Sequence, residues 1–168
     1  MAEDKKTVAS AAEFLARLDA VERRLATHAT LPPPDGLTAP DPGTGEQWDA
    51  GQVWAHLAEF ISYWMDEMRI LLSTREAMPV SFGRVKSDPN RIAAIERGRH
   101  ESPAVLMKQI SAALADLRDL LNGLGGQDWS AQGRHSTLGI MNVERIVDEF
   151  LVEHLEQHAA QLDSLMIR

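Results

Sequence analysis

Two histidines stand four residues apart in the stretch VEHLEQHAAQL, at residues 152–162. On a helix, residues four apart lie on one face with about 5–6 Å between their Cβ atoms, so two imidazoles can bind one ion. His154 and His158 also follow the three- and four-residue steps of the apolar residues around them. The pair is interpreted either as metal ligands or as polar residues at the half-solvated edge of an apolar face.

A third histidine, His56, lies between Val53 and Phe60 on the apolar side of an earlier predicted helix. Three neutral imidazoles, two from one helix and one from a facing helix, would hold an ion and leave positions open for water and substrate. The three together favour a metal site of the catalytic type. Glu59, one turn after His56, could accept the second ring N–H of that histidine, with a solvated surface charge as the alternative.

Two tryptophans, two further histidines and a basic segment complete the candidates. Trp48 and Trp129 are predicted to lie in loops next to helix ends, where they would roof the site and contact substrate, with core packing as the alternative. His135 in another loop would reach the mouth of the site as a proton carrier, whereas His28 suits a helix C-terminus. The basic segment 84–99 would bind an anionic group or, more commonly, form a salt-bridged connection.

Four amphipathic helices are predicted to position these residues, because apolar side chains recur at helical spacing along most of the chain. Ser10 and Glu13 form the capping box expected at the start of the first helix, and Asp49 is the expected N-cap of the second. No convincing strand is found, and 74–100 is expected to be connection with one short helix at 89–97. The four long helices are predicted at about residues 10–28, 49–73, 102–121 and 142 to near the C-terminus.

The connection between the first two helices is rich in proline, with five of the eight prolines between Pro32 and Pro42. Such a stretch cannot continue a helix, and a loop of this length is usually functional or mobile, so it is a candidate lid. Four helices without strands predict an all-α fold, a four-helix bundle in which this long connection permits a crossover. The length suits one domain, residues 1–168.

The composition excludes several classes of protein and of site. The formal net charge of −8, without a basic block to offset it, argues against nucleic acid as a partner. No stretch has the 18 or so apolar residues of a membrane span, and the start lacks the apolar core of a signal peptide, so a cytoplasmic location is expected. Without cysteine, any metal must be held by His, Asp or Glu.

The stretches WDAGQVWAHLAEFISYW and HSTLGIMNVERIVDEFLVEHLEQHAAQL, in this order, resemble the DinB-like (DinB/YfiT) superfamily over nearly the whole chain. The resemblance implies a four-helix bundle with a divalent metal, zinc or nickel among the candidates, held by His56, His154 and His158. Members of that superfamily include metal-dependent transferases that use bacillithiol or mycothiol, a mycothiol-dependent maleylpyruvate isomerase, and hydrolases. Dimers are common among them, which implies a homodimer here.

The function expected from the residues and the resemblance is that of a divalent-metal-dependent thiol S-transferase acting on a small-molecule substrate. An open metal position would bind the sulfur of an external low-molecular-weight thiol and lower its pKa toward the thiolate. The lack of cysteine fits a thiol supplied from outside, and equally fits a metal-dependent hydrolase with metal-bound water. A non-catalytic bundle that binds a small ligand or a metal is the third interpretation, and no catalytic residue is assigned.

Overall fold

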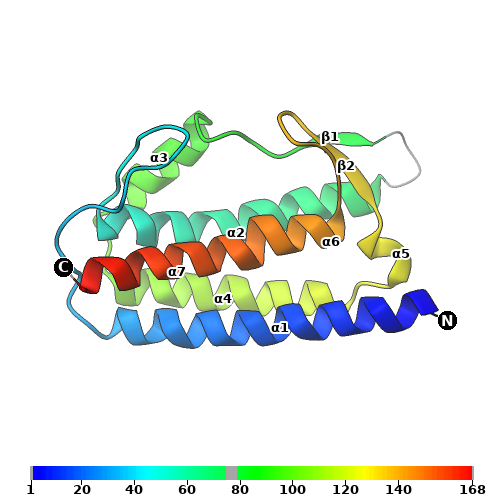
Figure 1. The fold of residues 1–168 in the computed structure, drawn as a ribbon, viewed down its shortest axis with the longest axis horizontal. Coiled ribbons are helices and arrows are strands. Elements are labelled where there is room, and N and C mark those ends of the chain that lie inside the picture. The colour runs from blue at the N-terminus through cyan, green and yellow to red at the C-terminus, as the bar shows by residue number, and fades with distance from the viewer. Residues whose placement is uncertain (1, 75–78, 168) are drawn as a thin grey trace.

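Four long helices packed side by side make up most of the computed structural model, which describes residues 2–74 and 79–167 (Figure 1). The last of them is continuous but divided by a π-helical turn, η1. The predicted all-α four-helix bundle is confirmed. The long helical elements are α1 (Ala2–Ala29), α2 (Ala50–Ser73), α4 (Pro103–Asn122), α6 (Val143–Ile146), η1 (Val147–Val152) and α7 (Glu153–Met166).

Short polar side chains begin three of the long helices, as local sequence signals predict. The carboxylate of Asp49 accepts the backbone N–H of Gln52 at the start of α2, and the Gln52 side chain accepts the N–H of Asp49 in return. Ser102 caps α4 and Asn142 caps α6. The predicted start of the first helix at Ser10 is wrong, because α1 is already helical from Ala2 and places Ser10 inside the helix.

The helices do not alternate in direction along the chain. Figure 1 shows α1 and α7 running one way and α2 and α4 running the other way. The proline-rich connection joins α1 to α2 at one end of the bundle and makes an ordinary reversal. The crossover instead lies between α2 and α4, in a connection that returns along the outside of the bundle and contains the short helix α3 (Pro89–Gly98).

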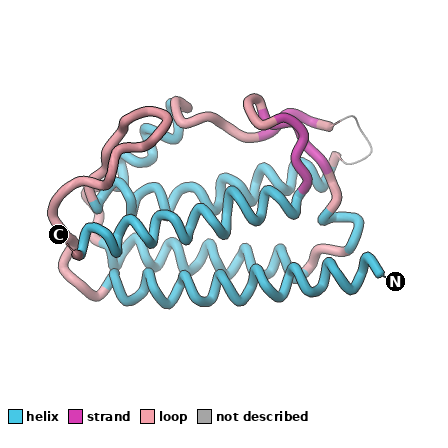
Figure 2. The backbone as a smooth tube through the Cα atoms, in the orientation of Figure 1, coloured by secondary structure: helices cyan, strands magenta, loops and turns pink. Residues whose placement is uncertain are grey.

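A small sheet lies over one end of the bundle (Figure 2), although no strand was predicted. It has the order β1-β2-β3, with β1 parallel to β2 and β2 antiparallel to β3. Gly133 pairs with both neighbouring strands, and a Cβ there would lie 2.7 Å from Phe82 and 2.9 Å from Leu71. Glycine therefore permits the close approach of the sheet to α2. The strands are β1 (Val80–Phe82), β2 (Gln132–His135) and β3 (Gly139–Asn142).

The π-helical turn η1 sets which face of the last helix is buried. Four residues of α-helix turn about 40° more than a full circle, so a series of four-residue steps drifts around the helix. The wider turn of η1 takes up this drift and keeps the series on the core side. The buried residues at four-residue steps, all with 0% exposure, are Val143, Val147, Leu151, Leu155 and Ala159. His154 and His158 each precede a member of this series and lie at its edge.

Large apolar side chains from all four long helices fill the bundle. Leu18 of α1, Phe60 of α2, Leu114 of α4 and Leu155 of α7 are completely buried. Burial of this kind contributes roughly 25 cal/mol for each Å² of apolar surface removed from water. In the described ranges of the chain, none of the helices combines the length and the hydropathy required to cross a membrane.

Candidate metal centre

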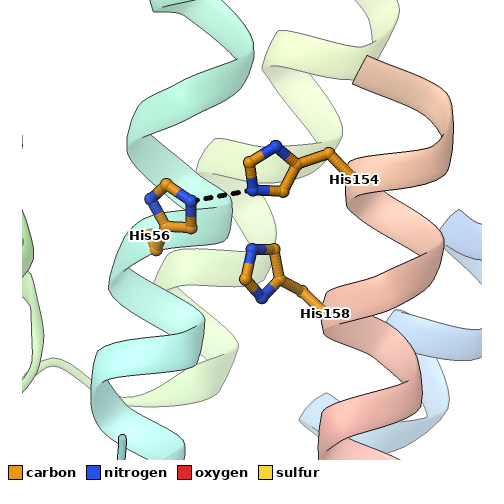
Figure 3. A group of neighbouring side chains, drawn as sticks. All are labelled: His56, His154 and His158. Atoms are coloured by element: carbon orange, nitrogen blue, oxygen red, sulfur yellow. Dashed lines mark hydrogen bonds between the residues drawn. The ribbon is translucent and has the colours of Figure 1, made fainter. Parts of the chain in front are cut away.

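Three histidines from two helices face one another inside the bundle (Figure 3). His56 comes from α2, and His154 and His158 come from successive turns of α7. One ring nitrogen from each can be chosen so that all three lie within 4.8 Å of one another. The ring centroids are 4.6–5.1 Å apart, and Nε2 of His56 is 3.1 Å from Nε2 of His154. The structure therefore brings together the three histidines that the sequence singled out.

Hydrogen bonds at the far side of two rings set their tautomers. Nδ1 of His56 is 2.8 Å from a carboxylate oxygen of Glu59, and Nδ1 of His158 is 2.7 Å from the amide oxygen of Gln161. Both partners are acceptors, so each Nδ1 carries the proton and donates it. Nε2 of each ring then carries a lone pair, which is the form of imidazole that binds a metal; that of His56 accepts from Nε2–H of His154, and that of His158 has no partner in the described structure. The predicted contact between His56 and Glu59 is present.

The side chains of the three histidines fit a divalent metal. Nε2 of His158 is buried, and within residues 2–74 and 79–167 it has no hydrogen-bond partner. An unsatisfied buried polar atom costs about 1–3 kcal/mol, so a bound ion at this position would remove a real penalty. The Nε2 atoms of His56 and His154 are joined by a hydrogen bond of 3.1 Å, which a bound ion would replace.

Burial lowers the pKa of all three histidines. For His158 burial is the largest cause and brings the pKa to about 4, against the opposing effect of the hydrogen bond that its ring donates to Gln161. For His56 and His154, burial is again first, and the neighbouring His158 and the cation of Arg91 lower the pKa further. All three rings are consequently neutral near pH 7, and no proton competes with a metal for their lone pairs.

This pKa shift predicts acid sensitivity of the metal-free protein. Between pH 6.5 and 4 an unfolded chain protonates residue 158 while the native protein does not, so stability is full above about pH 6.5 and falls as the pH drops. A shift of this size corresponds to roughly 3 kcal/mol. Urea unfolding of wild type and His158→Gln at pH 7.5 and 4.5 measures it. The variant should lose less stability on acidification, and equal losses would show that His158 is not the cause.

Glu59 is itself paired with Arg84, a contact that the sequence did not predict. Nη2 of Arg84 donates to the Glu59 carboxylate over 2.5 Å, and both side chains are nearly buried, with 8% and 13% exposure. The Arg84 guanidinium also lies over the Tyr63 ring, 4.0 Å from its centroid. Burial raises the pKa of Glu59, and Arg84 opposes this effect. A chain of contacts therefore runs from Tyr63 through Arg84 and Glu59 to His56.

The three histidines line a cavity of about 1200 Å³. Its other walls are the proline-rich connection at 38–48, the start of α3, the turn between β2 and β3, and the exposed side of η1 and α7. The candidate lid thus forms one wall of the cavity, and its closing over the site remains a prediction. A pocket of this size exceeds the 300–1,000 Å³ usual for a small ligand, so it has room for two molecules at once.

Only one of the two tryptophans predicted to roof the site lies there. The Trp48 ring is stacked on His158 with centroids 5.9 Å apart and meets His56 edge-on at 5.2 Å. Trp129 ends the short helix α5 (Gly126–Trp129) and stacks on Phe14 of α1 at 5.9 Å. In the described structure it is buried and is not among the residues lining the cavity. The position predicted for Trp129 was wrong, because its apolar surface packs into the core.

The two remaining candidate histidines, His135 and His28, lie in different environments. His135 is buried in β2, lines the cavity, and accepts backbone N–H groups of Thr137 and Leu138 at Nδ1. It therefore lines the cavity from a strand and not from the predicted loop, because residues 132–135 pair with β1 and β3, and its role as a proton carrier stays a prediction. Nε2 of His28 pairs with Asp163 over 2.6 Å, which ties the end of α1 to α7 and makes His28 structural.

Gly83 is predicted to be essential for the position of His135. Its φ of +85° is unfavourable for other residues, and a Cβ there would lie 2.5 Å from the His135 ring. Gly83→Ala should lower the free energy of unfolding by about 1–3 kcal/mol, measured in urea. Gly45→Ala is the matched control, because Gly45 has φ +73° with nothing within 4 Å of a Cβ. Equal losses in both variants would contradict a packing role for Gly83.

Fold and site together define a class of protein: a helical bundle with a buried group of three neutral histidines that opens on a large cavity. Comparison with known families is consistent with this class. The sequence model of the DinB superfamily matches residues 17–162, and the chain belongs to that superfamily. The resemblance noted from the sequence is thereby confirmed.

Solved structures share the fold at low sequence identity. YfiT from Bacillus subtilis, described as a probable metal-dependent hydrolase with an unusual four-helix bundle topology, matches with a TM-score of 0.71 and 18% identity, over 94% of this chain and 86% of its own. A mycothiol-dependent maleylpyruvate isomerase matches with a TM-score of 0.67 and 15% identity, over 90% of this chain. An uncharacterised protein from Escherichia coli UTI89 matches with a TM-score of 0.62 and 14% identity, over 94% of this chain and 92% of its own.

These matches establish the shared fold. The chain spans 60% of the length of the isomerase, so more than a third of that protein has no counterpart here. Comparison with curated protein sequences found no match.

Proposed function

We propose that this protein is a divalent-metal-dependent enzyme in which His56, His154 and His158 hold the ion, with zinc and nickel as the candidates. The observation that supports this most is the buried Nε2 of His158, which faces the other two rings without a hydrogen-bond partner in the described structure. Glu59 and Gln161 keep the proton of two rings on the opposite nitrogen. Three imidazole ligands leave a position free, as catalytic metal sites do.

The reaction we propose is transfer of an external low-molecular-weight thiol to a small electrophilic substrate. When bound, the metal would lower the pKa of the thiol and favour the thiolate. The chain has no cysteine of its own, so the sulfur must come from another molecule. The cavity of about 1200 Å³ has room for a thiol and a second substrate together.

We assign roles in this proposed reaction to the side chains around the three histidines. The three neutral histidines would orient the thiol, and Glu59 with Arg84 would hold His56 in place. Trp48, stacked on His158, covers the group from the loop side and would keep water from the sulfur. The mycothiol-dependent isomerase of similar fold supports a thiol as co-substrate.

A metal-dependent hydrolase is the second candidate. It needs the same three histidines, with water in place of the thiol, and the description of YfiT as a probable metal-dependent hydrolase favours it. A cavity that admits a thiol and a substrate also admits water. The two candidates therefore share the metal and differ in the second reactant.

Thermal unfolding in the presence of thiols separates these candidates. Zinc-loaded and metal-free protein would be heated with bacillithiol, mycothiol, glutathione or cysteine, and with the corresponding S-methylated compounds as controls. The transferase predicts that one free thiol raises the melting temperature of the zinc-loaded protein only, and that its S-methylated form does not. Indifference to every thiol, with zinc bound, would contradict the transferase and favour the hydrolase.

A further inference from the structure

The basic segment 84–99 supplies three cations to the wall of the cavity, and two of them already have anionic partners. Arg84 is paired with Glu59, and Lys86 is paired with Asp41 over 2.6 Å. These two ion pairs hold the connection against α2 and the proline-rich loop. They explain most of the local positive charge as structural, which leaves Arg91 as the third cation.

Arg91 is a buried cation without an ion pair. Its residue is 9% exposed, and Nη1 donates to the backbone oxygen of Lys86 over 2.8 Å. Over residues 2–74 and 79–167, no carboxylate lies within ion-pair distance of it, and its other side-chain N–H groups have no hydrogen-bond partner. Burying a charge is costly unless a counter-charge and hydrogen bonds compensate it. Arg91 lines the cavity.

Trp48 connects Arg91 with the three histidines. Cζ of Arg91 lies 5.3 Å from the centroid of the Trp48 ring, and the same ring lies 5.2 Å from that of His56. Arg91, Trp48 and the three histidines line the same cavity, so a molecule whose anionic end contacts Arg91 can extend past Trp48 toward the histidines. Trp48 lines the cavity between those two ends, although the residue is 7% exposed and its ring already contacts His158 and Arg91.

We propose that Arg91 binds a carboxylate of the substrate and that the substrate class is a small organic acid. The planar guanidinium fork can donate two parallel hydrogen bonds to a carboxylate, which a lysine cannot do. With the carboxylate at Arg91, the remainder of the molecule extends through the cavity past Trp48, and its reactive end reaches the histidines. This inference rests on the proposed function for the reactive end, whereas carboxylate binding by Arg91 can be tested alone.

The test measures binding of benzoate, and of benzamide as its neutral match, to metal-free protein at pH 7.5, by quenching of tryptophan fluorescence and by calorimetry. Omitting the metal prevents a carboxylate from binding to the ion instead, and at this pH the three histidines are neutral. Wild type should bind benzoate at least tenfold more tightly than benzamide. Arg91→Met should remove this preference, and Arg91→Lys should retain a part of it.

Lys86→Met is the control for the general charge of the wall, because Lys86 lines the same cavity and is already paired with Asp41. It should change benzoate affinity less than about twofold. Near-UV circular dichroism checks the fold of each variant, and Arg91→Lys keeps the test decisive if Arg91→Met does not fold.

Three results would overturn the proposal: benzoate bound no better than benzamide, unchanged benzoate affinity in both Arg91 variants, or no binding by wild type up to about 50 mM. Inorganic phosphate is measured in parallel, and if it binds tenfold more tightly than benzoate, the carboxylate assignment is wrong and the ligand is a phosphoryl group. Zinc titration of the same samples separates the two proposals. Arg91-dependent benzoate binding without a zinc site would retain this inference and reject the proposed function.

Discussion

Replacing His158 with alanine is expected to weaken zinc binding by at least about 100-fold, because it removes one of three ligands and the buried lone pair that has no other partner in the described structure. His56→Ala should have a similar effect, since His56 is the one ligand from the facing helix. Competition with a chromogenic chelator at pH 7.5 measures both affinities. At this pH the three rings of the wild type are neutral, so proton competition does not obscure the comparison.

His28→Ala is the matched control for these two variants. His28 also lies between helices, but it pairs with Asp163 away from the cavity, so its loss should leave zinc affinity within about twofold. If His158→Ala binds zinc as tightly as the wild type, the three histidines are not the metal site. If His28→Ala weakens zinc binding as much as His158→Ala, the measured effect comes from the fold and not from the ligands.

The second large effect is expected at Glu59. Glu59→Gln should lower zinc affinity by about 10–100-fold, because the carboxylate that accepts from Nδ1 of His56 is replaced by a neutral amide. The same change leaves Arg84 without its buried anionic partner, so the free energy of unfolding should fall by roughly 3 kcal/mol or more. Zinc competition and urea unfolding on one preparation give both quantities.

Glu153→Gln separates the role of Glu59 from a general loss of negative charge. Glu153 lines the same cavity from α7, is exposed, and has no hydrogen bond to any of the three histidines. Its replacement should change zinc affinity and stability little. Equal effects at the two positions would mean that Glu59 acts through long-range charge and not through its contact with His56.

The helical framework was predictable because its signals are local. Asp49, Ser102 with Pro103, and Asn142 each begin a helix where the sequence indicates it. The three histidines were found for the same reason, since their spacing and their place among apolar residues can be read within one or two turns. The error at Ser10 shows the limit of such signals, because a capping pattern inside a longer helix looks the same.

The remaining parts of the site depend on contacts between residues far apart in the chain. Arg84 reaches Glu59 from a connection with no regular pattern, and β1 and β2 pair across about 50 residues through strands too short to show alternation. Trp48 and Trp129 both precede or end helices, yet one faces the histidines and the other faces Phe14. The local sequence signal is the same at Trp48 and Trp129, and only the packing in the folded protein distinguishes the two.

X-ray absorption at the zinc edge, on zinc-loaded wild type after gel filtration, tests the central claim most directly. The account predicts one zinc per chain with three imidazole nitrogens at about 2.0–2.1 Å and one further light ligand. Adding the thiol that raises the melting temperature of the zinc-loaded protein should replace this light ligand with sulfur at about 2.3 Å. Less than about a tenth of an equivalent of zinc, or a spectrum without imidazole scattering, would contradict a metal centre built from His56, His154 and His158.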